Sequence, residues 1–208
     1  MIRRLNQQHI KCLRFLATDL RDPLYVTANA FMILVLLGFV YGLCFPQQTN
    51  DYIQQMSQQI NSSGIVSEDG MIDVVDLFSR NVMTLSMTLL YGFLPILYLP
   101  ALPLGINATL LGLMAAYYIH NDISLLVYLA ALVPHGIFEL PTMVLCFTLA
   151  LHLCRSMTQQ SRKPELSKAF GPTLKNILRV HLLCVIPLLA VSAIIECYIT
   201  PAVMGLLI

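Results

Sequence analysis

The sequence predicts an all-α, polytopic membrane protein, and three observations lead to that fold class. Of its 208 residues, 57% belong to the apolar set AVILMFWYC and only 11% are charged, against about a quarter in ordinary soluble domains. Several uncharged runs are long enough to cross a bilayer, and the basic residues gather in two segments. Together with a mean hydropathy of +0.74, this excludes a soluble domain and a disordered chain. The net charge of +1 excludes a strongly basic nucleic-acid-binding protein.

Residues 1–22 form a basic segment with apolar residues at roughly helical spacing. This pattern suits a cytoplasmic amphipathic helix that lies on the inner leaflet. A basic tail that only orients the first span would have the same composition. The apolar positions are Ile2, Leu5, Leu13, Leu16 and Leu20.

The first predicted span covers residues 24–46, a run of 23 residues without a charge. As a helix it is about 34 Å long, which exceeds a hydrocarbon core of roughly 30 Å. A cleaved signal peptide would have a shorter apolar region and a small-residue cleavage site. We therefore expect this segment to stay as an anchor.

Residues 47–80 predict an extracytoplasmic loop. It holds five acidic residues and one base, Arg80. Its acids lack the spacing of a calcium-binding loop, so we interpret them as a solvated face. Ile53, Met56 and Ile60 are spaced as on one face of a short surface helix.

The uncharged run 82–119 predicts two spans. Its 38 residues would make a helix of roughly 57 Å, which is too long for one crossing. A cluster of prolines supplies the break, giving helices over about 81–99 and 103–119. The prolines are Pro95, Pro100 and Pro103, and a small-residue stripe that allows close helix packing follows at Gly105, Thr109, Gly112 and Ala116.

The fourth predicted span lies between Asp122 and Arg155 and contains Pro134. Either residues 122–133 form a re-entrant or interfacial half-helix and Pro134 opens the span, or one long helix kinks at this proline. We favour the half-helix.

The chain ends with a cytoplasmic basic segment, residues 156–180, and a last span over 181–208. Within the basic segment, Gly171-Pro172 predicts the restart of a helix.

The distribution of bases gives the topology. Eleven of the twelve Lys and Arg residues either precede the first span or lie between the fourth and fifth. The positive-inside rule places both groups in the cytoplasm, which requires an even number of crossings between them. We therefore expect a single transmembrane domain over 1–208 with about five spans, a cytoplasmic N-terminus and an outside C-terminus.

Three ionisable side chains fall inside the predicted spans. His135 and Glu139 are one helical turn apart, and Glu196 lies within the last span. Such a group near the bilayer centre costs roughly 2.5–3.5 kcal/mol on insertion scales, so these side chains should face protein or water. Further polar residues lie on helix faces that we expect to turn toward them: Asn81, Thr84, Thr88, Tyr91, Asn107, Thr142, Cys146, Ser192 and Thr200.

Four chemistries fit these three side chains. They could bind a divalent metal such as zinc, although H-x-x-x-E has one histidine fewer than the common zinc-peptidase motif. They could act as a proton relay or a general acid/base pair, or line a peptide- or ion-conducting groove. They could also form an interhelical hydrogen-bond clamp without further function. No cofactor is required by the sequence, and its six cysteines contain no C-x-x-C pair.

Three segments carry a resemblance to a known family: GINATLLG, PHGIFELP and AIIECYITP, with FSRN before the second span. From about residue 20 onward the sequence resembles the stage II sporulation protein M family of polytopic membrane proteins, and P-H-G-x-x-E-L-P is the most specific motif. The sporulation branch generally lacks this His and Glu, so a sporulation role does not follow. The motif positions carried over are Asn81, Asn107, His135, Gly136, Glu139, Pro141, Glu196 and Pro201.

The resemblance implies a component of a complex in the bacterial cytoplasmic membrane. Sporulation members anchor peptidoglycan-remodelling enzymes, and related members occur with ABC-type ATPases and in the production of head-to-tail cyclised bacteriocins. The leading hypothesis is therefore the maturation or export of a peptide, or organisation of the envelope. The implied partners are the lipid bilayer, membrane proteins or an ABC-type ATPase, a precursor peptide and a second copy of the chain.

Two alternatives stand beside this hypothesis. One is an intramembrane peptidase or peptide cyclase in which His135 is the general base, Glu139 orients it or binds metal, and Glu196 is an acid or ligand. The other is a non-catalytic scaffold for peptidoglycan-remodelling enzymes.

Overall fold

The computed structural model describes residues 2–62, 73–94, 98–162 and 167–206, and the regular secondary structure in these ranges is entirely helical. The helices before the C-terminal one are α1 (Ile2–Thr18), α2 (Arg21–Cys44), α3 (Pro46–Ser62), α4 (Val74–Tyr91), α5 (Ala101–His120) and α6 (Leu125–Arg162). The C-terminal helix consists of α7 (Ser167–Val180), a first π turn (His181–Val185), α8 (Ile186–Ile194), a second π turn (Ile195–Ile199) and α9 (Thr200–Met204).

The predicted class, an all-α helical membrane bundle, is confirmed. Within the described ranges, four helices are long and apolar enough to cross a membrane: α2, α5, α6 and the C-terminal helix from Phe170 to Met204. The second predicted span, 81–99, is represented by α4, which is shorter and more polar and packs against α6 and α8. The expected count of five therefore depends on α4 as the fifth crossing.

Helix α4 begins earlier than predicted because its N-terminus is capped. The Asp73 carboxylate accepts hydrogen bonds from the backbone N–H groups of Val75 and Asp76, at 2.6 and 3.2 Å, which satisfies donors that a helix start leaves unpaired. One turn later, Asp76 pairs with Arg80 at 2.8 Å. The helix ends at Tyr91 and α5 begins at Ala101, so the break predicted in the proline-rich run is present.

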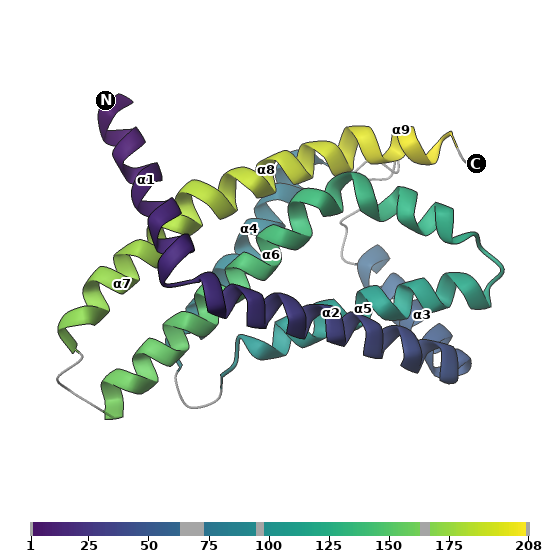
Figure 1. The fold of residues 1–208 in the computed structure, drawn as a ribbon. Coiled ribbons are helices and arrows are strands. Elements are labelled where there is room, and N and C mark those ends of the chain that lie inside the picture. The colour runs from purple at the N-terminus through teal and green to yellow at the C-terminus, as the bar shows by residue number, and fades with distance from the viewer. Residues whose placement is uncertain (1, 63–72, 95–97, 163–166, 207–208) are drawn as a thin grey trace.

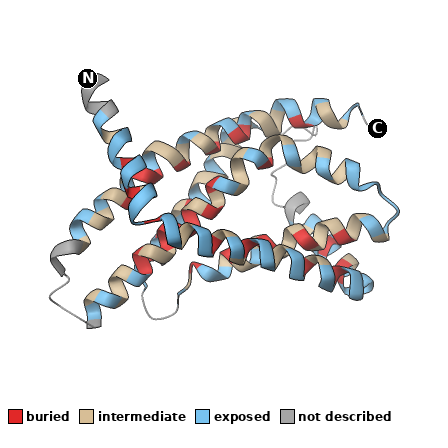
Figure 2. Ribbon diagram, viewed as in Figure 1, coloured by how far each residue is buried: buried red, intermediate tan, exposed pale blue. Residues whose placement is uncertain are grey.

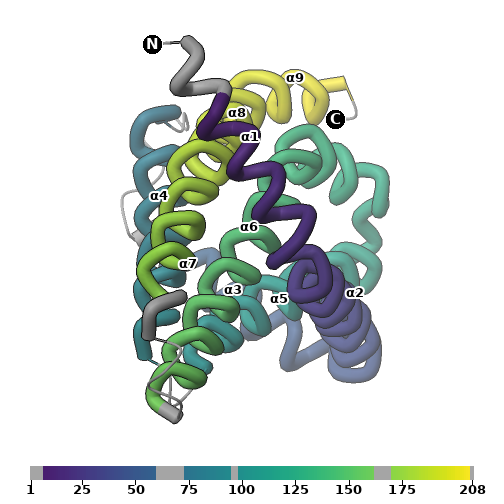
Figure 3. Tube along the Cα trace, turned by 60° about the vertical axis from the view of Figure 1, so that its left-hand side comes forward, coloured from purple at the N-terminus to yellow at the C-terminus, as the bar shows by residue number. Residues whose placement is uncertain are grey.

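Helix α6 is the centre of the bundle. It packs against α2 and α5 on one side and against α4, α8 and α9 on the other (Figures 1 and 3). Two apolar cores correspond to these two sides, and the half-buried Met143 contributes to both. A side chain that projects from α6 can therefore meet residues from either layer.

The predicted half-helix before Pro134 is wrong. Residues from Leu125 to Arg162 form one continuous helix that includes Pro134 and Pro141. Its first part is inclined to the remainder in Figure 1, the kind of bend that proline causes by removing a backbone hydrogen bond. The alternative of one long, kinked helix is the correct one.

The restart predicted at Gly171-Pro172 is also wrong. Helix α7 begins at Ser167 and continues through Pro172. Pro172 lies inside the helix as its sixth residue, where it removes one backbone hydrogen bond without ending the helix.

The small-residue stripe on α5 forms its contact with α2. A Cβ added at Gly112 would lie 2.0 Å from the backbone oxygen of Val35, and one added at Gly38 would lie 2.3 Å from that of Thr109. The two backbones are thus in direct contact, as predicted for α5, and Gly38 is the matching small residue on α2. Gly105 does not contribute, since a Cβ there would meet nothing within 4 Å.

Two helices from segments outside the predicted spans, α1 and α3, are packed on the bundle. In α1, Cys12 and Phe15 are buried, whereas Leu13 is 66% exposed, so the predicted apolar face is shifted. In α3, Ile53 is buried, and this helix packs on α5. The outward faces of α2 are apolar and exposed in Figure 2, as expected for a helix surrounded by lipid.

Candidate functional site

Three ionisable side chains converge between α6 and the C-terminal helix, and we call them the carboxylate cluster. His135 and Glu139 project from one face of α6, and Glu196 comes from the second π turn. One ligand atom from each lies within 4.8 Å of the others. In the described part of the chain, this is the one group of three or more His, Cys, Asp or Glu side chains placed to share a metal ion.

Hydrogen bonding orients the imidazole of His135. The Thr200 hydroxyl can donate to the backbone oxygen of Ile195 at 3.3 Å, and its oxygen lies 3.4 Å from Nδ1 of His135. When Thr200 donates to Ile195, its oxygen can accept from Nδ1–H, and in this assignment of the tautomer the lone pair lies on Nε2. That nitrogen faces the carboxylate oxygen Oε2 of Glu139 at 3.9 Å.

Ser192 holds the carboxylate from the opposite side. Its hydroxyl oxygen lies 3.5 Å from Oε2 of Glu139 and 3.3 Å from the backbone oxygen of His135. Ser192 is fully buried, whereas the side chains of His135 and Glu139 keep 15% and 20% exposure. The cluster is thus supported by buried neighbours while its ligand atoms remain partly accessible.

The second π turn belongs to the same arrangement. A π turn interrupts the regular hydrogen-bond ladder and changes the direction of the side chains that follow, and such turns are frequent at functional sites. Here the turn contains Glu196 and immediately precedes Thr200. Both residues reach His135 from this local change of helix geometry.

A small polar cavity adjoins Glu139. Its volume is about 80 Å³, enough for ordered water at a share of roughly 30 Å³ per molecule. In the cavity wall, the Asn107 side chain donates to the Pro103 carbonyl at 2.8 Å, and the Thr88 hydroxyl donates to the Thr84 carbonyl at 3.0 Å. The lining residues are Asn81, Thr84, Leu85, Thr88, Asn107, Glu139, Met143, Phe147 and Leu189.

Of the other predicted residues, Asn81, Thr84, Thr88 and Asn107 line the cavity and Ser192 and Thr200 contact the cluster. Tyr91 and Pro201 are exposed, and Cys146 lies near His181. Pro141 is exposed on the outside of α6, so the structure does not bring it to the site. Gly136 is buried against Leu132 and Leu140. Thr142 is fully buried, but its hydroxyl donates to the Phe138 carbonyl of its own helix at 2.6 Å.

The sequence analysis missed a second polar group, which we call the thiol cluster: Ser86, Cys146 and His181. The Ser86 hydroxyl lies 3.1 Å from Nε2 of His181, and the Cys146 sulfur lies 4.0 Å from Nδ1. The Cys146 thiol also donates to the Leu85 carbonyl at 3.2 Å. The signal available in the sequence was His181, a histidine at the start of the last apolar span. Of the three residues, only Cys146 was among the predicted polar residues, on the same helix face as His135 and Glu139.

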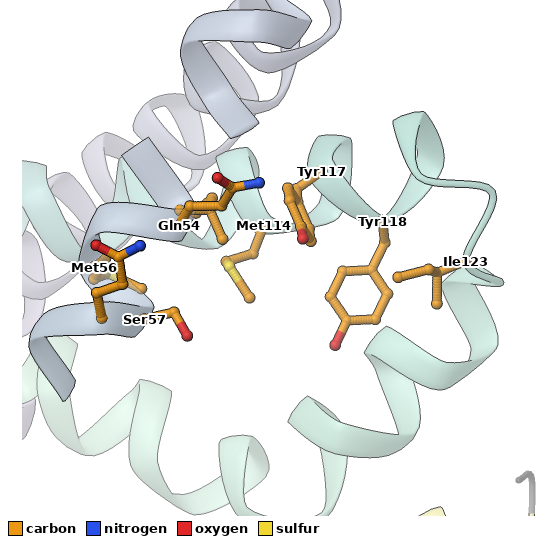
Figure 4. Close-up of a pocket in the computed structure, with 9 residues that line it drawn as sticks. Gln54, Met56, Ser57, Met114, Tyr117, Tyr118 and Ile123 are labelled. Atoms are coloured by element: carbon orange, nitrogen blue, oxygen red, sulfur yellow. The ribbon is translucent and has the colours of Figure 1, made fainter. Parts of the chain in front are cut away.

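A larger hollow lies elsewhere, between α3 and α5 (Figure 4). Its volume is about 520 Å³, and Ser57, Met114 and Tyr117 are among the residues that line it. No residue of the carboxylate cluster or its cavity takes part in it. The hollow is therefore separate from the chemistry described above.

The carboxylate cluster presents electron pairs to a common point. The Nε2 lone pair of His135 and the oxygens of two carboxylates would repel one another unless a proton or a metal ion lay between them. One nitrogen and two carboxylate ligands form a donor set that suits zinc and leave a fourth tetrahedral position open. The same atoms could exchange protons with a bound substrate.

Comparison with known proteins assigns the family. A family model described as stage II sporulation protein M matches residues 30–201, and the chain belongs to this family. No match was found among curated proteins or among solved structures.

Proposed function

We propose that this protein is the membrane component of a complex that matures or exports a peptide at the bacterial cytoplasmic membrane. The carboxylate cluster is its working centre. The observation that carries the proposal is the convergence of His135, Glu139 and Glu196 within 4.8 Å in a bundle of apolar helices. Ionisable groups are rare inside membranes and mark substrate or ion pathways and catalytic sites.

The support around the cluster favours a working site over a simple clamp. A hydrogen-bond clamp would pair each donor with one acceptor, but here three groups that can each carry a lone pair meet. Thr200 and Ser192 fix His135 and Glu139 in this arrangement. Outer-shell partners of this kind orient metal ligands and raise their basicity. A divalent metal such as zinc is therefore included in the proposal, held by His135, Glu139 and Glu196.

The same geometry favours one second candidate, an intramembrane peptidase or peptide cyclase. His135 would take a proton from the attacking water, or from the attacking amine in a cyclase, through Nε2. The new bond would form at the peptide carbonyl carbon, the C–N bond would break, and His135 would return the proton to the leaving nitrogen. The polar cavity beside Glu139 would hold water next to the reacting groups.

The test uses the full chain in liposomes with a candidate precursor peptide, in the presence and in the absence of an ABC-type ATPase. Peptide maturation is followed by mass spectrometry for the wild type, Glu139→Gln and Glu196→Gln. We expect both variants to lose at least 100-fold in rate while keeping their helical circular dichroism. If the wild type acts without the ATPase, the enzyme alternative is favoured.

Asp122→Asn is the matched control. It also replaces a carboxylate by an amide, and Asp122 has a φ of 54° that asparagine tolerates. This variant should keep the wild-type rate. If the cluster variants mature the peptide normally, the proposed role of the cluster is wrong, and a scaffold becomes the better explanation.

A further inference from the structure

A groove between α1 and α7 combines basic and apolar side chains. Its volume is about 480 Å³, within the usual range of ligand sites. Lys175 and Arg179 are its bases and lie one turn apart on α7. The full lining is Gln8, Gly171, Leu174, Lys175, Leu178, Arg179, Leu182 and Leu183.

The groove continues onto an apolar surface. Leu178, 44% exposed, lies between the two bases in the sequence, and Leu182, 58% exposed, lies one turn beyond Leu178. The site therefore places exposed aliphatic side chains beside the positive charges, and the aliphatic surface extends past Arg179 to Leu182. An amphiphile with an anionic head matches both features.

The length of the C-terminal helix places the groove at a membrane boundary. The apolar helix Phe170–Met204 has 35 residues and is about 52 Å long, whereas the hydrocarbon core is roughly 30 Å thick. Its ends must extend beyond the hydrocarbon. Lys175 and Arg179 are the sixth and tenth residues of this stretch, so we expect them near the headgroup level on the predicted cytoplasmic side.

The position of Arg179 is fixed by its neighbours. Its guanidinium donates to the Asn176 side-chain oxygen at 2.5 Å. Burial raises the pKa of the Cys12 thiol on α1, and the nearby Arg179 charge opposes that rise. Arg179 on α7 is thus near Cys12 of α1 and is one of the residues that line the groove.

We propose that this groove binds one anionic glycerophospholipid, with its phosphate at Lys175 and Arg179 and an acyl chain along Leu178 and Leu182. Basic pockets between helices on the cytoplasmic side are known to hold anionic headgroups. The proposal uses no residue of the carboxylate cluster, so a negative result in the peptide assay leaves it standing.

Native mass spectrometry of the full chain in neutral detergent tests the proposal, using palmitoyl-oleoyl phosphatidylglycerol and the corresponding phosphatidylcholine as probes. We expect the first lipid to bind at least tenfold more tightly. The double variant Lys175→Gln/Arg179→Gln should weaken phosphatidylglycerol binding about 30-fold, or about fivefold per base. Equal binding of the two lipids would overturn the proposal.

Arg14→Gln/Arg155→Gln is the matched control, because it removes two exposed bases that do not line the groove. Its lipid affinity should stay within twofold of wild type, and a loss equal to that of the groove variant would mean a non-specific charge effect. sn-Glycerol 3-phosphate at the same concentration should not displace the lipid. Displacement would reassign the site to free phosphates.

Discussion

Two histidines lie between α6 and the C-terminal helix, and their surroundings differ in one decisive respect. His181 is 5% exposed, and its ring nitrogens face the neutral groups of Ser86 and Cys146. His135 faces Glu139 at 3.9 Å, and Glu196 is close by. Both sites are associated with a π turn. Both ring nitrogens of His181 therefore have neutral hydrogen-bonding neighbours in the thiol cluster. In the carboxylate cluster, by contrast, Nε2 of His135 faces a carboxylate.

The difference teaches that burial of a polar residue in this bundle does not by itself indicate function. In the thiol cluster one assignment of the hydrogens gives each of them an acceptor: Ser86 donates to Nε2, Nδ1–H faces the Cys146 sulfur, and Cys146 donates to the Leu85 carbonyl. Such a chain joins α4, α6 and the C-terminal helix as a structural clamp. The carboxylate cluster reaches this complementarity only when it takes up a proton or a metal ion, and for this reason we propose the chemistry there.

The largest expected effect comes from exchanging each histidine for glutamine. His135→Gln should lower the peptide maturation rate at least 100-fold, since it removes the proposed base and metal ligand. His181→Gln should keep the rate per folded chain within twofold of wild type. Mass spectrometry of the peptide product measures both. A similar loss in the two variants would remove the functional distinction between the clusters.

The second largest expected effect is the stabilisation by zinc, which should distinguish the carboxylate cluster from the thiol cluster. Zinc at about one hundred times its dissociation constant should raise the free energy of unfolding of the wild-type protein by about 2.7 kcal/mol. Thermal unfolding followed by circular dichroism should show this rise in His181→Gln as well, and not in Glu196→Gln. If a chelator and zinc leave the wild-type transition unchanged, the cluster holds no metal and the proton-transfer form of the proposal is retained.

Stability should show the opposite pattern. His181→Ala is expected to lower the free energy of unfolding by about 2 kcal/mol, because it opens a buried cavity and leaves the Ser86 hydroxyl without its partner. His135→Ala should lower the free energy of unfolding by less than about 1 kcal/mol. The His135 side chain is partly exposed, and its removal relieves the repulsion between its lone pair and the two carboxylates. Urea unfolding in mixed micelles compares the two. A larger loss for His135→Ala would mean that the carboxylate cluster is the main structural clamp.

The smallest effect concerns the hydroxyls beside each histidine. Ser86→Ala should cost about 0.6 kcal/mol, the average for interhelical hydrogen bonds in membranes, with an unchanged maturation rate. Ser192→Ala should have a comparable stability cost but also reduce the rate, because Ser192 holds Glu139. The same unfolding and peptide assays measure both variants. Equal rates in the two would show that Ser192 does not position the carboxylate.

Much of the fold follows from hydropathy and proline. The first span and the break between α4 and α5 were predicted because a membrane fixes how long an apolar run can be. The prediction of a half-helix before Pro134 was wrong because it ignored packing between helices. Neighbouring helices can accommodate a proline inside a membrane helix, and here α6 packs against helices on both sides.

Within a regular α-helix, the sequence correctly predicted which side chains of the carboxylate cluster share a face. His135 and Glu139 share a face because they are four residues apart, and the apolar surroundings of Glu196 predicted that it would turn inward. The two π turns cannot be inferred from residue spacing, because each shifts the faces that follow it. His181, in the first of these turns, lies beside Ser86 and Cys146, and Glu196, in the second, lies beside His135 and Glu139.

The central place of α6 also has a consequence for biosynthesis. This helix supplies His135 and Glu139, whereas Glu196 and its supports Ser192 and Thr200 belong to the C-terminal helix. During translation, α6 is therefore made before Glu196. The three side chains come together only when the C-terminal helix packs against α6, so formation of the carboxylate cluster depends on that docking step.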